Sequence, residues 1–488
     1  MKISYSSFDI LVVCLFTVFG LNFAWALDDL SNAALVGDKE KLEALIAHGV
    51  DVKGEKGGTL MCLAIEGNNK EVVKLLIARG ADVNAKNWQG DSLLHLAVKS
   101  GNHDILKLLL VSKADVNARN ESLQTPIFEA VRFQMPYQGK GGFAPSFSGP
   151  DQSQYYKSIS PLPIKELIQL LLEYGAEVNI KDRFGETPLH SVTTAEIVEL
   201  LLARGALINA PRDDGATSLH LAAKDMNADV VKALLEHGAN INAKNRFGET
   251  PLHIATTEGI VKLLLARDSL IDVRRNDGAT PLHLASVFGR NEITKMLLTY
   301  GAHVNAKTTD GVTPLHYANG IGIVKLLLAN GAEVDASDSG GNTPLYMADK
   351  PEVVELLLKH GATLNARNST GQTPLLRVIR TYISNLPAHG LMSGPLGDDI
   401  VVAHGGNIEV IKALLDHGAD VNLDDREGCL PLFYVREARK SGAYFEVIDQ
   451  LKVVENLLLE HGAYLEKRKK KNVIQSQQNF PPELAGIP

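Results

Sequence analysis

The stretch TPLHLASVFGRNEITKMLLTYGAHVNA, residues 280–306, is one complete unit of a pattern that returns about eleven times between Leu60 and Leu465. The opening Thr-Pro-Leu-His recurs unchanged at Thr187, Thr250 and Thr313, and with one substitution at Thr217 and Thr343. Looser copies begin at Thr59, Ser92, Thr125, Thr373 and Leu430. So many copies in phase predict a stack of similar units rather than a domain built around one core.

The residues of each unit predict two helices and a turn. Thr280 can cap a helix N-terminus because its hydroxyl can accept from an unpaired amide, and Pro281 fits the first helical position, where no donor is needed. A second helix such as 71–77 is apolar around much of its circumference, so it needs a neighbour on each side. Gly301 follows the second helix, where a left-handed backbone is least costly without a Cβ. A short extended stretch, 304–306, and a polar turn complete the unit.

These motifs resemble the ankyrin repeat, whose period is about 33 residues and whose opening is Thr-Pro-Leu-His. The resemblance covers nearly the whole chain after its first 26 residues. It implies an all-α repeat solenoid of about 11–12 units, each a helix-turn-helix with a short β-hairpin finger. It also implies that the fingers and first helices form a concave surface that binds other proteins.

Length and charge agree with this interpretation. An ordinary globular chain of 488 residues would predict about three domains. A solenoid is instead one continuous stack in which each unit contacts only its neighbours, so we expect a single elongated domain. The formal net charge of −8 is mild for this length, and it does not indicate nucleic acid as a partner.

No sequence motif of a known catalytic centre is present. The chain lacks a Gly-x-Ser-x-Gly elbow, a phosphate loop with Gly-Lys-Ser/Thr and a His-Glu-x-x-His pair. Carboxylate pairs at 213–214, 398–399 and 424–425 lie in predicted turns and loops, whereas acid–base catalysis needs a cleft that separates two pKa values. We therefore expect no enzyme activity, no cofactor and no small-molecule substrate.

The first 26 residues differ in composition from the rest. Lys2 precedes an apolar run over residues 10–19, and Ala24-Trp25-Ala26 precedes an acidic segment. This order predicts a secretory signal peptide cleaved after Ala26, and hence a secreted or periplasmic protein. The alternative is an uncleaved membrane anchor formed by residues 10–26, which approach the length that spans a bilayer. A membrane would be a partner only in that case.

The ends of the predicted solenoid, residues 27–469, read as caps. Residues 27–58 form a degenerate N-terminal unit rich in charge, as a terminal repeat with one solvated face requires. Residues 426–469 form the C-terminal unit, and a polar tail, 470–488, follows. We interpret the basic run 467–471 as a solvated chain end rather than a nucleic-acid or lipid site.

The repeats differ in length at one place. From the first residue of the first helix to the glycine after the second helix, the units that begin at Leu60, Ser218 and Pro281 have equal length. Four units are three residues shorter, beginning at Pro188, Pro251, Pro314 and Pro344; three are longer, beginning at Pro126, Pro374 and Pro431. Because the caps and the turn are kept, we expect every change to lie between the first and second helices. Insertions on one face of a repeat protein often mark the binding face.

The first insertion, residues 133–163, contains Phe143, Phe147, Tyr155 and Tyr156 among many glycines, prolines and serines. Disordered linkers are poor in aromatic residues. The insertion is therefore expected either to fold back over neighbouring helices or to present these four rings to a partner. The second insertion, residues 384–405, reads as a flexible loop, and the third, within 439–451, as a helix extension.

Aromatic residues also occur in the predicted finger turns. Trp88 lies in one turn, and Arg-Phe-Gly-Glu occurs twice, placing Phe184 and Phe247 at equivalent positions. An exposed aromatic ring lowers solubility unless something covers it. We expect Phe184 and Phe247 to pack on the adjacent hairpin; the alternative is that all three rings bind a partner.

Recurring histidines do not indicate a metal site. One histidine occupies the same position in successive units: His95, His190, His220, His253, His283 and His316. This spacing predicts a ladder, whereas zinc needs three or four ligands that converge on one point. The family resemblance implies structural hydrogen bonds for these rings. Cys62 and Cys429 lie in distant repeats and should not form a disulfide; Cys62 reads as a core residue, and Cys429 lies in a turn, where it could be exposed.

The sequence thus predicts an exported, non-catalytic scaffold for protein–protein interaction. One alternative is an effector of a host-associated microbe that binds host proteins. A second, from another class, is a cryptic hydrolase that uses the loops 133–163 and 384–405.

Overall fold

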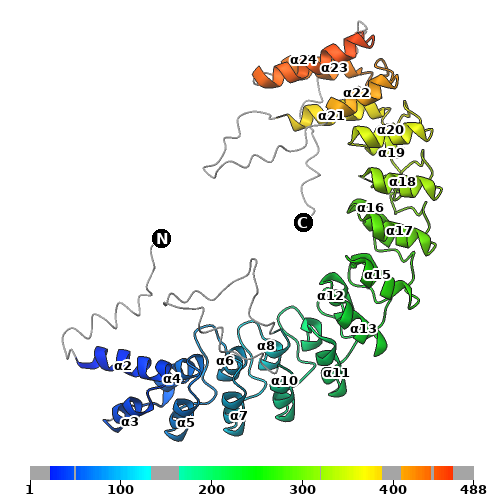
Figure 1. Ribbon diagram of the computed structural model, residues 1–488. Helices are drawn as coiled ribbons and strands as arrows, with labels where there is room; N and C mark the ends of the chain where they lie inside the picture. The colour runs from blue at the N-terminus through cyan, green and yellow to red at the C-terminus, as the bar shows by residue number, and fades with distance from the viewer. Residues whose placement is uncertain are drawn as a thin grey trace. The chain divides into compact units, whose positions relative to one another are not determined.

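The computed structural model describes residues 22–48, 51–132, 164–318, 320–386, 408–440 and 445–464. The chain falls into two compact units, Met1–Asn276 and Asp277–Pro488. Each unit is described by itself below, with the helix labels of Figure 1.

The first unit is a succession of short helices. They are α2 (Asn22–Val36), α3 (Lys39–Ala47), α4 (Gly54–Glu66), α5 (Lys70–Ala78), α6 (Leu93–Lys99), α7 (His103–Val111), α8 (Pro126–Arg132), α10 (Ile164–Glu173), the 3₁₀ helix η1 (Pro188–Ser191), α11 (Ala195–Ala203), α12 (Ser218–Lys224), α13 (Ala228–Glu236), α14 (Pro251–Ile254) and α15 (Glu258–Leu265).

The second unit continues the same order. Its helices are α16 (Pro281–Val287), α17 (Asn291–Thr299), α18 (Ile321–Ala329), α19 (Pro344–Met347), α20 (Pro351–Lys359), α21 (Pro374–Asn385), α22 (Ile408–Asp416), α23 (Pro431–Lys440) and α24 (Phe445–Glu460).

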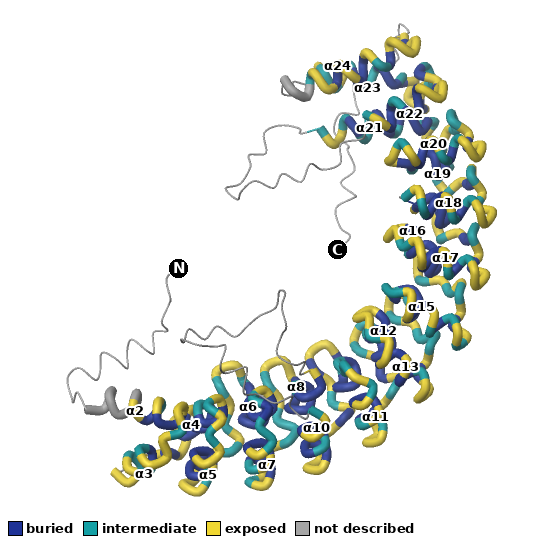
Figure 2. The backbone as a smooth tube through the Cα atoms, in the orientation of Figure 1, coloured by how far each residue is buried: buried dark blue, intermediate teal, exposed yellow. Residues whose placement is uncertain are grey.

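Helices of the same kind stack on one another within each unit (Figure 1). The first helices α4, α6 and α8 contact in sequence, and so do the second helices α5, α7 and α10. Helix α7 lies between two others of its kind and buries Ile105, Leu106, Leu109 and Leu110. Figure 2 shows buried residues running along the packed sides of the helices in both units. The predicted all-α repeat solenoid is confirmed, and its core is a series of interfaces between neighbouring repeats.

The first helices α6, α12, α14, α16, α19 and α21 begin where the motif predicts, whereas α4 begins at Gly54, before the loose copy at Thr59. Thr280 has extended backbone angles immediately before α16, and Pro281 occupies the first turn. Thr280 and His283 form a reciprocal capping box. The backbone N–H of Thr280 donates to His283 Nδ1 at 3.1 Å, and the hydroxyl lies 2.9 Å from the same nitrogen. The motif thus satisfies polar groups at the helix start that burial would otherwise leave unpaired.

The short repeats differ from the prediction. The missing three residues come from the first helix itself and not only from the connection after it. Helices α6, α12 and α16 have seven residues each, whereas η1, α14 and α19 have four. The segment that begins at Pro314 forms only turns. The first turn of this helix carries the cap and the buried leucine. A repeat can therefore lack the last turn of its first helix and still pack on its neighbours.

In the long repeats the additional residues either follow the first helix or lengthen it. The first insertion separates α8, which ends at Arg132, from α10, which begins at Ile164, and the two helices pack on each other. Residues 133–163, including the four predicted aromatic residues, lie outside the described residues. Helix α21 is extended to twelve residues, and most of 384–405 is likewise not described. In the last repeat both helices are lengthened, to 10 and 16 residues.

The fingers form turns rather than regular strands. Among the described residues the β-structure consists of one isolated bridge between Lys86 and Ser92. In that finger the N–H of Asn87 donates to Asp91 O at 2.9 Å, and the N–H of Gly90 donates to Asn87 O at 3.0 Å. The Asn87 side chain accepts from the amides of Gln89 and Asp91. Two backbone bonds are too few to extend a ladder into strands.

Hydrogen bonds between successive fingers compensate for the missing strands. In the first unit the N–H of Arg183 donates to Ser122 O, Asp213 to Phe184 O and Arg246 to Asp214 O, at 2.6–3.1 Å. Gly248 allows the next such approach, in which the N–H of Asn276 donates to Phe247 O at 3.0 Å: its φ is +77°, and a Cβ there would lie 2.8 Å from Asn276 N. The finger turns are thereby tied into a continuous row within the unit.

The asparagine that follows the valine after the second helix links several repeats to the next. Asn179 Nδ2 donates to Gly205 O at 2.9 Å, and its Oδ1 accepts from the N–H of Leu207 at 2.8 Å. The same pair of bonds joins Asn117, Asn305 and Asn422 to the following repeats. Each side chain satisfies one carbonyl and one amide just past a second helix, groups that no helix bond can pair.

The first described helix crosses the predicted cleavage site. Helix α2 runs from Asn22 to Val36 and packs on α4, and Leu30, Ala33 and Ala34 of this helix are buried. Removal of residues 1–26 would retain these three buried residues. None of the helices in the described ranges is both long and apolar enough to cross a membrane. Residues 10–21 of the predicted leader lie outside those ranges.

The capping box provides a test of the helix start. We expect Thr280→Ala to lower the free energy of unfolding by about 1 kcal/mol, because Thr280 is fully buried and caps α16. Urea titration followed by circular dichroism measures the change. Thr299→Ala, at the exposed end of α17, is the control and should have little effect. Equal effects of the two substitutions would contradict the capping role.

Candidate functional site

The histidines that recur at one position of successive repeats hold the fingers through hydrogen bonds. His220 Nδ1 accepts from the N–H of Thr217 at 3.1 Å, and Nε2–H donates to Glu249 O of the next repeat at 3.1 Å. The same two contacts recur at His95, His190, His283 and His316. Because the amide can only donate, Nδ1 must be the acceptor, and the ring is neutral with its proton on Nε2.

Burial keeps these rings neutral. Desolvation lowers the pKa of His95, His190, His220 and His316 below the ordinary value of 6.5. The predicted structural hydrogen bonds are thus present, and each ring joins its own helix cap to the finger of the following repeat. Across the described ranges no three His, Cys, Asp or Glu side chains are grouped so that they could hold a metal ion.

The finger tips of the first unit carry the predicted aromatic residues. Trp88 is 87% exposed, Phe184 64% and Phe247 52%. The expectation that Phe184 and Phe247 pack on the adjacent hairpin is wrong. Neighbouring fingers meet through backbone hydrogen bonds, and the equivalent position in the finger between them is the polar Asp214, which offers no apolar surface. The backbones that carry the rings are therefore fixed, and the rings themselves are open to solvent.

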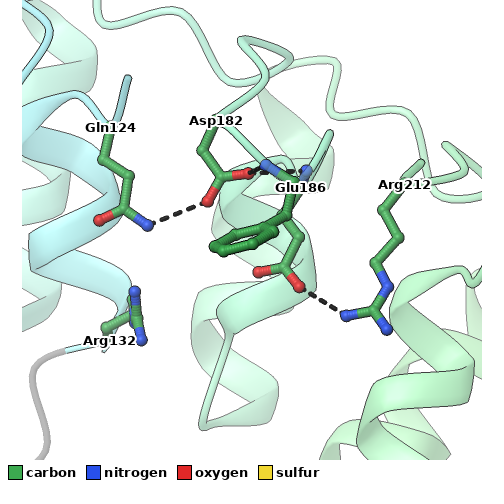
Figure 3. Close-up of a pocket in the computed structure, with 6 residues that line it drawn as sticks. Gln124, Arg132, Asp182, Glu186 and Arg212 are labelled. Carbon is green, nitrogen blue, oxygen red and sulfur yellow. Dashed lines mark hydrogen bonds and ion pairs between the residues drawn. The ribbon is translucent and has the colours of Figure 1, made fainter. Parts of the chain in front are cut away.

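A polar pocket of about 330 Å³ lies beside Phe184. Its lining residues come from three successive repeats: Gln124, Arg132, Asp182, Phe184, Glu186 and Arg212. Figure 3 shows Gln124 and Arg132 on one side of Asp182 and Arg212 on the other. The pocket combines an exposed aromatic ring with charged groups of both signs.

The carboxylates of this pocket are paired within the protein. Asp182 is buried and accepts from Gln124 Nε2 at 3.0 Å and from the backbone amides of Phe184 and Glu186. Glu186 forms an ion pair with Arg212 at 2.7 Å (Figure 3). Arg212 also binds Asp214 through two nitrogens, and this guanidinium lowers the pKa of Asp214 to about 2.

Arg132 differs from the other charged residues of the pocket. It is the last residue of α8, its side chain is exposed, and no ion pair joins it to a carboxylate of the described part of the chain. The insertion 133–163 begins at the next residue. Phe143, Phe147, Tyr155 and Tyr156 lie outside the described residues, so their predicted role in binding remains a prediction. Of the predicted binding residues, the structure brings only Phe184 to this pocket.

A cluster of arginines and tyrosines in the second unit lies outside the predicted sites. The Arg377 guanidinium lies 5.8 Å from the Tyr346 ring centroid, and the Arg380 guanidinium lies 4.8 Å from that of Tyr434. Tyr434 donates to Asp425 at 2.5 Å. Burial lowers the pKa of Arg377 and raises that of Tyr346. These residues satisfy one another, so they stabilise the last repeats.

A sequence signal for this cluster exists. Tyr346, Leu376 and Phe433 replace the motif histidine in three successive units. Without the imidazole, the link to the next repeat has to come from other side chains. Arg377 Nη1 donates to Ala348 O at 3.2 Å, just past the shortened α19.

Both described cysteines are free and buried. Burial raises the pKa of Cys62 to about 11, with a smaller contribution from the charge of Glu66, so this thiol is a poor nucleophile at neutral pH. The suggestion that Cys429 is exposed is wrong, since it is 3% accessible. Its amide donates to Asp425 Oδ1, which draws the turn inward.

Comparison with known proteins identifies the class of protein. The sequence profile of three-copy ankyrin repeats matches residues 30–120, 163–245, 240–308 and 303–368, and the single ankyrin-repeat profile matches 400–426. More than half of the chain is matched, and the chain belongs to the ankyrin-repeat family. The ankyrin repeat is a protein–protein interaction module.

Among solved structures, the chain is similar to the ankyrin repeat domain of Bcl-3, described as a unique member of the IκB protein family. The two are 31% identical over 40% of this chain and 92% of that one, with a TM-score of 0.36. No curated protein sequence matches.

The buried histidines predict a pH dependence of stability. Their folded-state pKa values lie below 6.5, so the unfolded chain binds protons first as the pH falls. Their contribution is complete above about pH 6.5 and is lost as the pH falls through the folded-state values. Urea midpoints at pH 7.5 and 5.5 should differ less in His220→Gln than in the unchanged protein. An identical difference in both proteins would show that His220 does not contribute.

Proposed function

We propose that this protein is a non-catalytic scaffold that binds another protein through the finger row of its first unit. The observation that supports this proposal is the exposure of Trp88, Phe184 and Phe247 on fingers whose backbones are fixed by hydrogen bonds. Large rings of this kind are frequent energetic anchors of protein interfaces. Family membership supplies the general role, and the exposed rings indicate where on the chain it is carried out.

The rigidity of the fingers favours tight binding. A backbone that is already fixed loses little further conformational freedom when a partner covers its side chains. Phe184 lies on a turn fixed by Asp182, and its carbonyl accepts from the next finger at 3.1 Å. A phenylalanine ring also has few rotatable bonds for the area it offers. Covering the rings would therefore bury apolar surface at a small entropic cost.

We also propose that the protein is exported and that residues 1–26 are removed. The support is the order of a positive start, an apolar run and the Ala-x-Ala site. The mature protein would retain the complete set of described repeats.

The proposed export predicts the mass of the mature protein. Intact-mass spectrometry of protein purified from its native cells should give a chain that begins at Leu27. The same measurement after Ala26→Arg should show an unprocessed chain, because signal cleavage requires a small residue at that position. A chain that keeps Met1 and sediments with membranes would support the anchor alternative instead.

The proposed binding surface predicts the effect of removing the rings. We expect Phe184→Ala with Phe247→Ala to reduce capture of partner proteins by at least tenfold, because two exposed anchors are lost. Thermal unfolding should be nearly unchanged, since neither ring is packed. Affinity capture from the native compartment, quantified by mass spectrometry, measures the effect.

The chain contains a matched control for this experiment. Phe288 in the second unit is 62% exposed, and Arg290 lies 4.8 Å from its ring, but it is not on a finger. Phe288→Ala should leave capture unchanged. If the double variant captures its partners as well as the unchanged protein does, the finger row is not the binding surface.

A further inference from the structure

The octapeptide Arg-Phe-Gly-Glu-Thr-Pro-Leu-His occurs twice, at residues 183–190 and 246–253. The second half of this octapeptide is the repeat motif and serves the fold. The first half forms a finger tip, where other fingers of the first unit carry different residues: Trp88 and Gln89 in one, Glu121 and Ser122 in another. The fold therefore accepts polar residues at the finger tip. It does not by itself require the phenylalanines at positions 184 and 247.

The structure reproduces the same surface at both copies. Phe184 and Phe247 are both exposed. Glu186 forms an ion pair with Arg212 of the next finger at 2.7 Å, and Glu249 pairs with Arg275 of its next finger at 3.2 Å. All of these residues belong to the first unit. Each copy is thus an exposed ring beside a neutralised Glu–Arg pair.

Basic residues occupy equivalent positions in the two copies. Arg132, at the end of α8, lines the pocket beside Phe184, and Lys224 holds the same position at the end of α12, one repeat before Phe247. Arg183 precedes Phe184 in its finger, and the Arg246 guanidinium lies 5.6 Å from the Phe247 ring centroid.

The charges around the two rings favour an acidic partner. No ion pair with a carboxylate is formed by Arg132, Arg183, Lys224 or Arg246 within the described ranges. The acidic groups of the two fingers that carry the rings are already paired: Glu186 and Glu249 with arginines, and Asp182 with Gln124 and backbone amides. On the finger before Phe184, Glu121 forms no ion pair within the described ranges. The finger between the two copies is different, because it carries Asp213 next to the paired Asp214.

The spacing of the copies restricts the partner further. Packed helices lie about 8–10 Å apart, so two repeats separate the rings by about 16–20 Å. An extended chain rises about 3.3 Å per residue, and its side chains alternate between two faces. A segment that contacts both rings from one face therefore needs an even spacing that spans this distance, which is six residues.

We propose that Phe184 and Phe247 form two equivalent subsites for one extended, acidic segment of a partner protein, whose apolar side chains at positions i and i+6 each cover one ring. This inference rests on the proposed binding function of the finger row. Carboxylates two residues from each apolar side chain lie on the same face of the extended segment and meet the basic residues, and the residues opposite Asp213 are neutral or basic. Occupation of the second subsite is intramolecular, so it raises affinity without a new kind of contact.

Synthetic peptides test the proposal directly. The probes are fluorescein-labelled peptides with two Glu-Ser-Phe-Ser-Glu elements in a Ser/Thr background, whose phenylalanines are five, six, seven or ten residues apart, and one peptide with a single element. Fluorescence anisotropy with the mature chain measures Kd. We expect the i+6 peptide to bind at least tenfold more tightly than the single-element, i+5 and i+7 peptides.

Variants assign the effect to the two rings. Phe184→Ala and Phe247→Ala should each lower the affinity of the i+6 peptide to that of the single-element peptide. Phe288→Ala should leave this affinity unchanged. Replacement of the glutamates of each element by lysines should weaken binding at least tenfold, more so at low salt.

The outcomes separate this inference from the proposed function. Equal affinity for all spacings, equal affinity of acidic and basic peptides, or no binding of any peptide overturns the two-subsite proposal. The binding function itself depends on the capture experiment with the double variant, which uses natural partners and no peptide. In one outcome, capture of natural partners depends on both rings although the peptides show no preference for spacing. That result would support the proposed function and contradict the two-subsite inference.

Discussion

The packing of each repeat against the next is the constraint on which the rest of the structure depends. A single pair of short helices cannot bury its own apolar surface, and α7 shows the solution, since its buried leucines lie between α5 and α10. Polar bonds follow the same direction: His95 Nε2–H donates to Gln124 O of the next repeat, and Asn117 binds Gly175 and Glu177 across the first insertion. Apolar burial and hydrogen bonding thus specify the same register between neighbours.

This arrangement leaves the finger tips outside the stabilising contacts. The finger backbone is fixed by the bonds between successive turns and by the histidine below, so the side chains at the tip can vary without loss of the stack. Exposed aromatic rings at some tips and polar residues at others are consistent with that freedom. A surface can therefore be adapted to a partner while the interfaces between repeats stay unchanged.

Much of the fold could be predicted from local chemistry. Thr280, Pro281 and Gly301 predict the start of one helix and the end of another because their preferences arise within a few residues. The shortened first helices could not be placed in the same way, since only the neighbouring repeats decide which turn of a helix can be lost. The roles of Arg377 and Tyr346 were missed for a related reason: they depend on side chains from adjacent repeats.

The candidate site shows the same division. The repeated Arg-Phe-Gly-Glu could be found in the sequence. Whether its phenylalanine is buried or exposed depends on the residue at the equivalent position of the next finger, and for Phe184 that residue is Asp214. The pairing of Glu186 with Arg212, and the lack of such a pair for Arg132, likewise join residues of different repeats.

The sequence by itself determined the repeat, the capping of its helices and the family, because these follow from short-range backbone preferences and from periodic apolar residues. Only the tertiary structure decided which rings are exposed, which charges are neutralised and which cysteine is buried. Those properties are set by the distance to side chains in neighbouring repeats, and the stacking of the repeats fixes that distance.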